Sequence, residues 1–187
     1  MRRTFLAAAA FILFAVAAPV RADEYGIDAV HSSVGFKIQH LGISWIQGRF
    51  NNMSGTFTLD KDPAKSSFNL TIQADSIDTN NKNRDDHLRS PDFFNVKQIP
   101  AMSFKSTAVR MVDGTIEVTG DFTLHGVTKP ITFTLKGGRM AEFPKGVQRT
   151  GYSTELSIKR SEFGMDKLTD AIGDTVYLAI SFEGVKK

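Results

Sequence analysis

Four histidines are the residues of this 187-residue chain best suited to bind a metal or to move a proton. They are His31, His40, His87 and His125, and none of them stands at a ligand spacing typical of zinc sites. The chain has no Cys, which excludes a Cys-bound metal, an iron–sulfur cluster, a disulfide and a thiol nucleophile. The sequence therefore predicts no metal site, and it favours structural or surface roles for the histidines.

The run Asp85-Asp86-His87 is the strongest candidate for acid–base chemistry. It falls in the segment 81–88, which is predicted to form a short helix, and successive helix residues do not share a face. No serine stands in a G-x-S-x-G motif, and the chain has no glycine-rich phosphate-binding loop. We therefore predict no catalytic residues, no required cofactor and a protein that is not an enzyme.

Apolar and polar residues alternate along most of the chain from residue 23 onward. This period of two is typical of antiparallel strands with one buried and one solvated face. The expected strands cover residues 34–38, 45–60, 68–74, 102–108, 116–124, 131–135, 152–158 and 176–182. Within 45–60, the apolar phase changes from Ile46 and Phe50 to Met53 and Phe57, which predicts a bulge at Asn51-Asn52.

Eight such strands must bury their apolar faces, either by closing into a barrel or by stacking as a sandwich. The long strands, the bulge and three inward glycines (Gly48, Gly55 and Gly120) favour the barrel. Two short helices are expected within 76–100, one over 81–88 and one beginning at Ser90, where Ser-Pro-Asp is a good helix start. The predicted fold class is all-β: an eight-stranded antiparallel barrel with one or two short helices between the third and fourth strands.

The interior of an eight-stranded barrel is either filled by side chains or holds one small ligand. A packed core is the ordinary explanation for any single inward phenylalanine. As a set, beside inward glycines that leave room, these rings would instead line an apolar tube that suits a chain-like ligand. The residues predicted to line this tube are Phe36, Ile38, Phe50, Phe57, Phe68, Leu70, Phe104, Phe122, Leu124, Phe133, Leu135, Tyr152 and Leu156.

The first 22 residues have the pattern of a secretory signal peptide. Arg2-Arg3 precedes an apolar run from Phe5 to Ala18, and Val20-Arg21-Ala22 fits a signal-peptidase site. The run is shorter than the ~20 residues that a membrane-spanning helix needs. We therefore predict cleavage after Ala22, a mature domain over 23–187 and no stable membrane insertion, with general secretory and twin-arginine export both left open.

Removal of this leader changes the charge balance of the protein. The full chain has 23 Lys and Arg against 20 Asp and Glu, which gives a formal net charge of +3. The leader contains Arg2, Arg3 and Arg21 but no acidic residue, so the mature domain has 20 charges of each sign. This neutrality gives no support for a nucleic-acid partner, and none is expected.

Several longer motifs occur one after another along the mature domain. They are Ile27-Asp28-x-x-His31-Ser32-x-Val34-x-Phe36, His40-Leu41-Gly42-x-Ser44, Arg84-Asp85-x-His87-Leu88-Arg89-Ser90-Pro91-Asp92-Phe93-Phe94, Pro100-x-x-x-Phe104-Lys105-Ser106, Gly120-Asp121-Phe122-Thr123-Leu124-His125-Gly126-Val127-Thr128-Lys129-Pro130 and Arg160-Ser161-x-Phe163-Gly164. In sequence, order and spacing they resemble the motifs of the YceI-like family of bacterial secreted lipid-binding proteins. The resemblance extends over residues 25–182.

The resemblance implies an elongated, lipocalin-like barrel that holds a long isoprenoid lipid, such as an isoprenoid quinone or a polyprenyl phosphate. It implies a soluble periplasmic carrier with no established enzymatic activity. In the segment 84–94, Arg84, His87 and Arg89 are candidates for contacts to a polar head group, since guanidinium groups recognise phosphate. Purely structural roles for these three residues are the alternative.

Other functions and partners also have to be considered. One alternative is a periplasmic enzyme that acts on a barrel-bound lipid, with His87 and Asp85 or Asp86 as acid–base groups; another is a carrier of a fatty-acid-type lipid. An outer-membrane barrel would need girdles of aromatic residues, which one Trp and three Tyr do not supply. The expected partner is a long-chain isoprenoid lipid, and a homodimer is left open.

Overall fold

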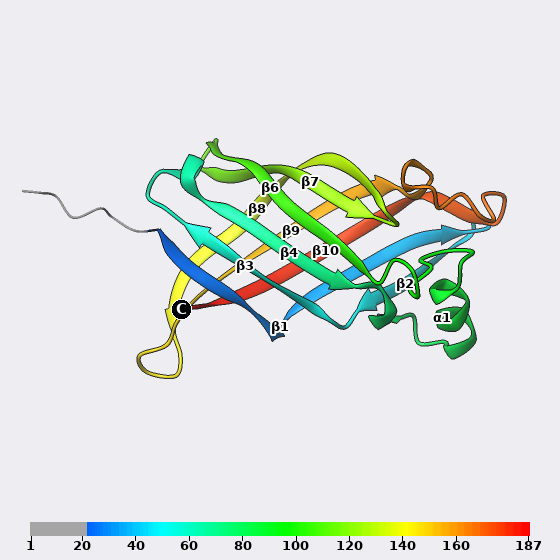
Figure 1. Ribbon diagram of the computed structural model, residues 1–187, viewed down its shortest axis with the longest axis horizontal. Helices are drawn as coiled ribbons and strands as arrows, with labels where there is room; N and C mark the ends of the chain where they lie inside the picture. Colours follow the sequence, from blue (N-terminus) through cyan, green and yellow to red (C-terminus); the bar gives the residue numbers. More distant parts are fainter. Residues whose placement is uncertain (1–21) are drawn as a thin grey trace, which may run out of the picture.

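The computed structural model describes residues 22–187, so the predicted signal peptide lies almost wholly outside the described residues. The described chain is dominated by strands, as Figure 1 shows. These are β1 (Asp23–His40), β2 (Ser44–Phe50), β3 (Met53–Leu59), β4 (Ser67–Gln73), β5 (Ile77–Asp78), β6 (Ala101–Val112), β7 (Thr115–Leu124), β8 (Val127–Glu142), β9 (Gln148–Lys159) and β10 (Ile172–Lys186). The helical elements are η1 (Pro63–Lys65), η2 (Ala74–Ser76), α1 (Lys82–Arg89) and η3 (Arg160–Phe163).

The sheet closes on itself because β1 pairs with two different strands that are far apart in the sequence. Neighbouring strands follow the order β10-β9-β8-β7-β6-β4-β3-β1, and β1 also pairs with β10. These eight antiparallel strands form a closed barrel, to which β2 and β5 are added beside β1. The predicted fold class is therefore confirmed. In Figure 1 the barrel is elongated, with α1 at one end and the β8–β9 turn at the other.

The expected single strand over 45–60 is in fact two strands that meet at Asn51-Asn52. β2 pairs with the second half of β1, whereas β3 pairs with residues 23–26 of β1 and with β4. At the break, the Asn51 amide donates to the Ser76 carbonyl, and the Gln73 amide donates to the Asn52 carbonyl. The phase change in the sequence thus marks the point where the wall divides and where η2 and β5 enter it.

α1 lies beside this division and is the helix that the sequence predicts. The Asn81 side chain caps it by accepting from the Arg84 amide. The second expected helix, beginning at Ser90, is not formed, and a series of turns takes its place. The amides of Phe93 and Asn95 both donate to the Ser90 carbonyl, and Asn95 has a φ of 48°, so the chain folds back instead of continuing as a helix.

The end of the barrel opposite α1 is filled by an aromatic plug. The plug consists of Tyr25, Phe57, Phe68, Tyr152 and Phe182, all of which are buried. Phe57 stacks on Tyr25 with ring centroids 4.9 Å apart and on Phe68 at 5.6 Å. Edge-on contacts of Phe57 with Tyr152 and Phe182 complete the plug. This half of the interior is therefore a packed core.

Two inward hydroxyl groups beside this core, those of Thr150 and Thr154, have no hydrogen-bond partner among the described residues. Thr154 on β9 is 5% exposed, and its Oγ1 has no hydrogen-bond partner among the described residues. A buried hydroxyl without a partner costs about 1–3 kcal/mol. We therefore expect Thr154→Val, which keeps the shape, to raise the free energy of unfolding by about 1 kcal/mol in urea denaturation.

The matched control for this prediction is Thr132→Val. Thr132 is exposed on the outer face, where its Oγ1 lies 2.8 Å from that of Thr119. Its replacement removes a satisfied hydrogen bond, so no gain in stability is expected. A loss of stability in Thr154→Val would contradict the prediction, because it would show that the Thr154 hydroxyl makes a favourable contact.

Candidate ligand-binding site

The half of the barrel covered by α1 contains a cavity of about 510 Å³. This volume is within the range of about 300–1,000 Å³ that is usual for small-molecule sites. Its walls are mainly apolar and come from neighbouring strands. On β1 and β10, Phe36 lies directly opposite Leu178 and Ile38 directly opposite Val176, and all four side chains line the cavity. The antiparallel register therefore builds a continuous apolar surface from two strands at opposite ends of the chain.

The segment after α1 closes one side of the cavity. Phe93 and Phe94 both line it, and the Phe94 ring lies edge-on to that of Phe50 with centroids 5.6 Å apart. Phe93 is 4% exposed and packs edge-on against His87 at 5.0 Å. The turns that replace the second expected helix thus place two aromatic rings on the cavity wall, one of them against Phe50 of β2.

The mouth of the cavity is marked by its solvent-exposed lining residues. Four lining residues are exposed: Gln39 on β1, Asn83 and His87 on α1, and Leu168 between η3 and β10. The other lining residues are buried or half-buried. The cavity therefore opens where the end of β1, α1 and the η3–β10 loop meet.

Every ionisable side chain that lines the cavity is basic. They are His40, Arg84, His87 and Arg160, and none of the described lining residues is Asp or Glu. Arg84 is held by Thr79: its Nε donates to Thr79 Oγ1 and its terminal nitrogen to the Thr79 carbonyl, each at 2.8 Å. One hydroxyl and one carbonyl acceptor satisfy only part of a guanidinium group, so Arg84 keeps N–H donors for a ligand.

Asp85 holds Thr79 in the position in which it binds Arg84. Its buried carboxylate accepts from the Thr79 amide at 2.9 Å and from Thr79 Oγ1 at 2.5 Å. The Thr79 hydroxyl therefore donates to Asp85 and accepts from Arg84, which orients the guanidinium group. His87 has a different partner, Asp92, at 3.2 Å, and Asp86 pairs with Lys82. The structure does not bring His87 together with Asp85 or Asp86 as an acid–base pair.

Arg160 is a buried cation on the cavity wall that the sequence did not single out as a site residue. It is 3% exposed, and it donates to the carbonyls of Met165, Lys167, Ile172 and Gly173 at 2.6–3.0 Å. Burial lowers the pKa of Arg160, although nearby Asp174 and Asp166 act in the opposite direction. Four carbonyl acceptors thus compensate for the burial of the charge and hold the η3–β10 loop against the mouth.

The structure divides the predicted site residues into two groups. Seven of them line the cavity: Phe36, Ile38, Phe50, Phe122, Leu124, Arg84 and His87. The others lie outside its lining: Phe57, Phe68, Leu70, Phe104, Phe133, Leu135, Tyr152, Leu156 and Arg89. Phe57, Phe68 and Tyr152 belong to the aromatic plug. Arg89 donates to the carbonyls of Asp75 and Ile77, so it fastens α1 to the barrel.

The inward glycines do not widen the cavity as the sequence suggested. A Cβ atom on Gly48 would lie 2.4 Å from the Phe36 ring, and one on Gly120 would lie 2.5 Å from the Phe104 ring. The rings of neighbouring strands therefore occupy the space that these glycines leave. The glycines permit large side chains to pack across the interior, and the hollow space arises elsewhere, under α1.

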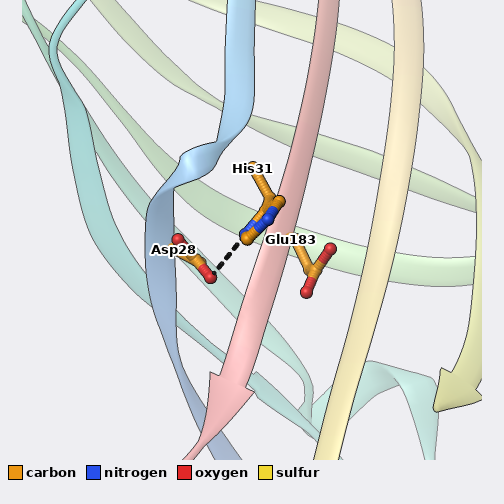
Figure 2. A group of neighbouring side chains, drawn as sticks. All are labelled: Asp28, His31 and Glu183. Atoms are coloured by element: carbon orange, nitrogen blue, oxygen red, sulfur yellow. Dashed lines mark hydrogen bonds and ion pairs between the residues drawn. The ribbon is translucent and has the colours of Figure 1, made fainter. Parts of the chain in front are cut away.

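A separate group of side chains at the kink of β1 has the composition of a metal site. Figure 2 shows Asp28, His31 and Glu183, whose ligand atoms all lie within 4.8 Å of one another. However, an Arg149 terminal nitrogen lies 2.5 Å from Asp28 Oδ2 and 2.7 Å from Glu183 Oε1. The guanidinium group already forms an ion pair with each of the two carboxylates. The group is therefore an ionic clasp that joins β1 to β9 and β10.

This clasp predicts an acid-sensitive contribution to stability. Hydrogen bonds from His31 and then Arg149 hold the pKa of Asp28 well below its usual range. Because the pKa is depressed in the folded state, the stabilisation is present above the unfolded pKa of about 4 and is lost as the pH falls below it. We expect Asp28→Asn to destabilise the protein by about 1 kcal/mol at pH 7 and by less near pH 3, as measured by urea denaturation.

The control is Asp121→Asn, which changes an exposed carboxylate on the outer face of β7. This variant should show the same dependence of stability on pH as the unchanged protein. An Asp28→Asn protein whose stability loss is equal at both pH values would contradict the assignment of the clasp.

Within residues 22–187, no helix is long and apolar enough to cross a membrane.

Comparison with known proteins identifies relatives of this chain. A family model described as the YceI-like domain matches residues 25–184. Protein YceI of Escherichia coli O17:K52:H18 is 42% identical over 181 residues, which cover 95% of this chain and 94% of that protein.

Solved structures show the same architecture. The crystal structure of Burkholderia cenocepacia BcnA has a TM-score of 0.76 at 24% identity and covers 84% of this chain and 98% of its own. A polyisoprenoid binding domain from Saccharophagus degradans has a TM-score of 0.69 at 18% identity, with 87% and 98% covered. The barrel, the match of the family model and the identity to protein YceI together show that the chain belongs to the YceI-like family.

Proposed function

We propose that this protein is a periplasmic carrier that holds one long isoprenoid lipid in the cavity under α1. The observation that carries the proposal is the composition of the cavity: apolar walls from β1 and β10, with only basic ionisable groups, Arg84 and Arg160 among them. A lipid with an apolar chain and an acceptor-rich head group matches both properties. The polyisoprenoid binding named for the Saccharophagus degradans domain supports the same ligand class.

The apolar walls can supply the affinity that a carrier needs. Each methylene group moved from water into the cavity contributes about 0.8 kcal/mol. About ten such groups give roughly 8 kcal/mol before ordering costs, which is the scale of a micromolar dissociation constant. Binding of this origin should depend little on salt concentration.

Arg84 and His87 are the residues that we propose for the head group. Both line the cavity, His87 is exposed at its mouth, and Arg84 is pre-oriented by Thr79. A polyprenyl phosphate and an isoprenoid quinone both present oxygen acceptors, which a guanidinium group can meet. The proposed orientation therefore has the head group near α1 and the chain directed along β1 and β10.

The periplasmic location rests on the leader, residues 1–22, and on the predicted cleavage after Ala22.

A fatty-acid-type carrier and a lipid-modifying enzyme are the competing functions. Because the cavity occupies one half of the barrel, a fatty acid is the competing ligand that the experiment must distinguish. The absence of a His87–Asp85 pair among the described contacts speaks against the enzyme.

Lipid analysis of the protein purified from the periplasm of a bacterial host tests the proposal. Native mass spectrometry should show one bound lipid per chain, and extraction should identify an isoprenoid. The matched variants are Ile180→Asp, on the cavity wall, and Ser181→Asp, the exposed next residue on the same strand. Only the first should lose the lipid. A bound fatty acid or turnover of the bound lipid would overturn the proposal in favour of the corresponding alternative. A lipid-free protein would overturn the carrier function itself.

A further inference from the structure

Exposed apolar side chains gather around the mouth of the cavity. Ile43 is 83% exposed, Leu41 is 56% exposed and Leu168 is 49% exposed. Leu41 and Ile43 lie in the turn between β1 and β2, and Leu168 lies in the η3–β10 loop and lines the cavity itself. The Leu41 amide donates to the Ala171 carbonyl at 2.7 Å, which holds the two loops together. The two loops lie at the end of the barrel where α1 lies (Figure 1), and we call their three exposed side chains the apolar rim.

An aromatic pair with a lysine lies behind this rim on the outer face of the barrel. Trp45 and Tyr177 are partly exposed and meet edge-on with ring centroids 5.5 Å apart. Lys37 Nζ lies 5.1 Å from the centroid of Trp45 and 5.6 Å from that of Tyr177. This arrangement of amphipathic side chains is the kind that places its apolar parts against lipid and its polar tips at the head groups.

The register places these groups in layers along the barrel. Trp45 pairs with Gln39, and Lys37 pairs with both Gln47 and Tyr177. Trp45 is the second residue of β2, directly after the turn that carries Leu41 and Ile43. Lys37 and Tyr177 lie further from the tip. The order from the tip is thus aliphatic rim, then tryptophan, then tyrosine with lysine, which follows the change from acyl chains to head groups in a bilayer.

We propose that the rim of Leu41, Ile43 and Leu168 docks on the surface of a lipid bilayer, with Trp45, Tyr177 and Lys37 at the level of the head groups. This inference rests on the proposed carrier function, because it gives the lipid a route between bilayer and cavity that avoids water. Leu168 belongs to both the rim and the cavity wall, so the two apolar surfaces are continuous. The contact is shallow and reversible, since only loop tips enter the bilayer.

A bilayer fits this surface better than a second copy of the chain. A stable protein interface uses about 20–30 residues on each side, with a densely packed apolar centre. The rim offers three aliphatic side chains on two loop tips and one aromatic pair behind them. The exposed Asp166 and Asp170 lie near Leu168 in the sequence, so the docking surface has negative charges as well as the positive charge of Lys37. Because the surface is not uniformly basic, we expect it to bind vesicles of neutral phosphatidylcholine without any anionic lipid.

Trp45 is the single tryptophan of the chain and therefore reports directly on this surface. Titration of the protein without its leader against phosphatidylcholine vesicles should shift its emission to shorter wavelength, and the protein should float with the vesicles. Ile43→Asp should weaken vesicle binding at least about tenfold in flotation. The matched control is Phe143→Asp, which changes a 75% exposed residue in the β8–β9 turn at the opposite end of the barrel and should leave binding unchanged.

The possible results separate docking from lipid carriage. Ile43→Asp should still bind a short-chain isoprenoid in solution, but it should transfer lipid between vesicles more slowly than the unchanged protein. Docking is overturned if the unchanged protein neither floats nor shifts, or if both variants bind vesicles equally well. It is also overturned if Ile43→Asp instead converts a dimer to a monomer. Ile43-dependent vesicle binding by a protein that carries no lipid would retain docking and refute the carrier function.

Discussion

Replacement of Phe57 by alanine is expected to lower the free energy of unfolding by about 3–5 kcal/mol, a large share of the stability of a single domain. Phe57 is 0% exposed at the centre of the aromatic plug, in contact with Tyr25, Phe68, Tyr152 and Phe182. These rings come from strands fixed in a closed barrel, so they can move little to fill the space that alanine leaves. Urea denaturation measures the loss, and Phe57→Leu provides a milder variant if the alanine protein does not fold.

Phe36→Ala is the matched control, because it removes the same side chain from the hollow half of the barrel. Phe36 is half-buried and lines the cavity, so its loss removes fewer packing contacts and should cost clearly less stability. Lipid binding should respond in the opposite way: Phe36→Ala should weaken it, and folded Phe57→Leu should not. Equal weakening by the two variants would show that the lipid passes through the plug, as the tube predicted from the sequence requires.

The strands could be predicted because their period of two reports directly on burial of one face. The phase change at Asn51-Asn52 also indicated where the wall is interrupted. The sequence could not show β5, because Ile77–Asp78 is too short for any period. The alternation also predicted only the second part of β1. The irregular pairing between Asp28 and Ser33 interrupts the alternation, so the first residues of this strand do not continue the same period.

The cavity was harder to predict than the strands. Phe36 and Phe57 have the same inward phase, yet one lines a hollow and the other fills a core. The difference depends on which rings from distant strands meet across the interior, and alternation along a single strand contains no information about this. Arg160 was missed for a related reason: its four carbonyl acceptors lie in residues 165–173 and reach it only through the return of the η3–β10 loop.

Arg160→Met is expected to lower the free energy of unfolding by about 3 kcal/mol or more. Methionine fills much of the same volume, so the loss comes chiefly from the carbonyls of Met165, Lys167, Ile172 and Gly173, which lose their donor. Urea denaturation measures the total effect. Hydrogen exchange should increase most in residues 165–173, because the guanidinium group joins this segment to the barrel.

Arg160→Lys separates charge from geometry in the same position. Lysine keeps the positive charge, but its ammonium group has three donors at one point and lacks the planar fork that reaches four carbonyls. Its stability should therefore lie between those of the unchanged protein and Arg160→Met. The two variants should also release bound lipid faster in the same order, since the loop that Arg160 holds carries Leu168 to the mouth. A methionine variant as stable as the unchanged protein would show that the loop does not depend on these four hydrogen bonds.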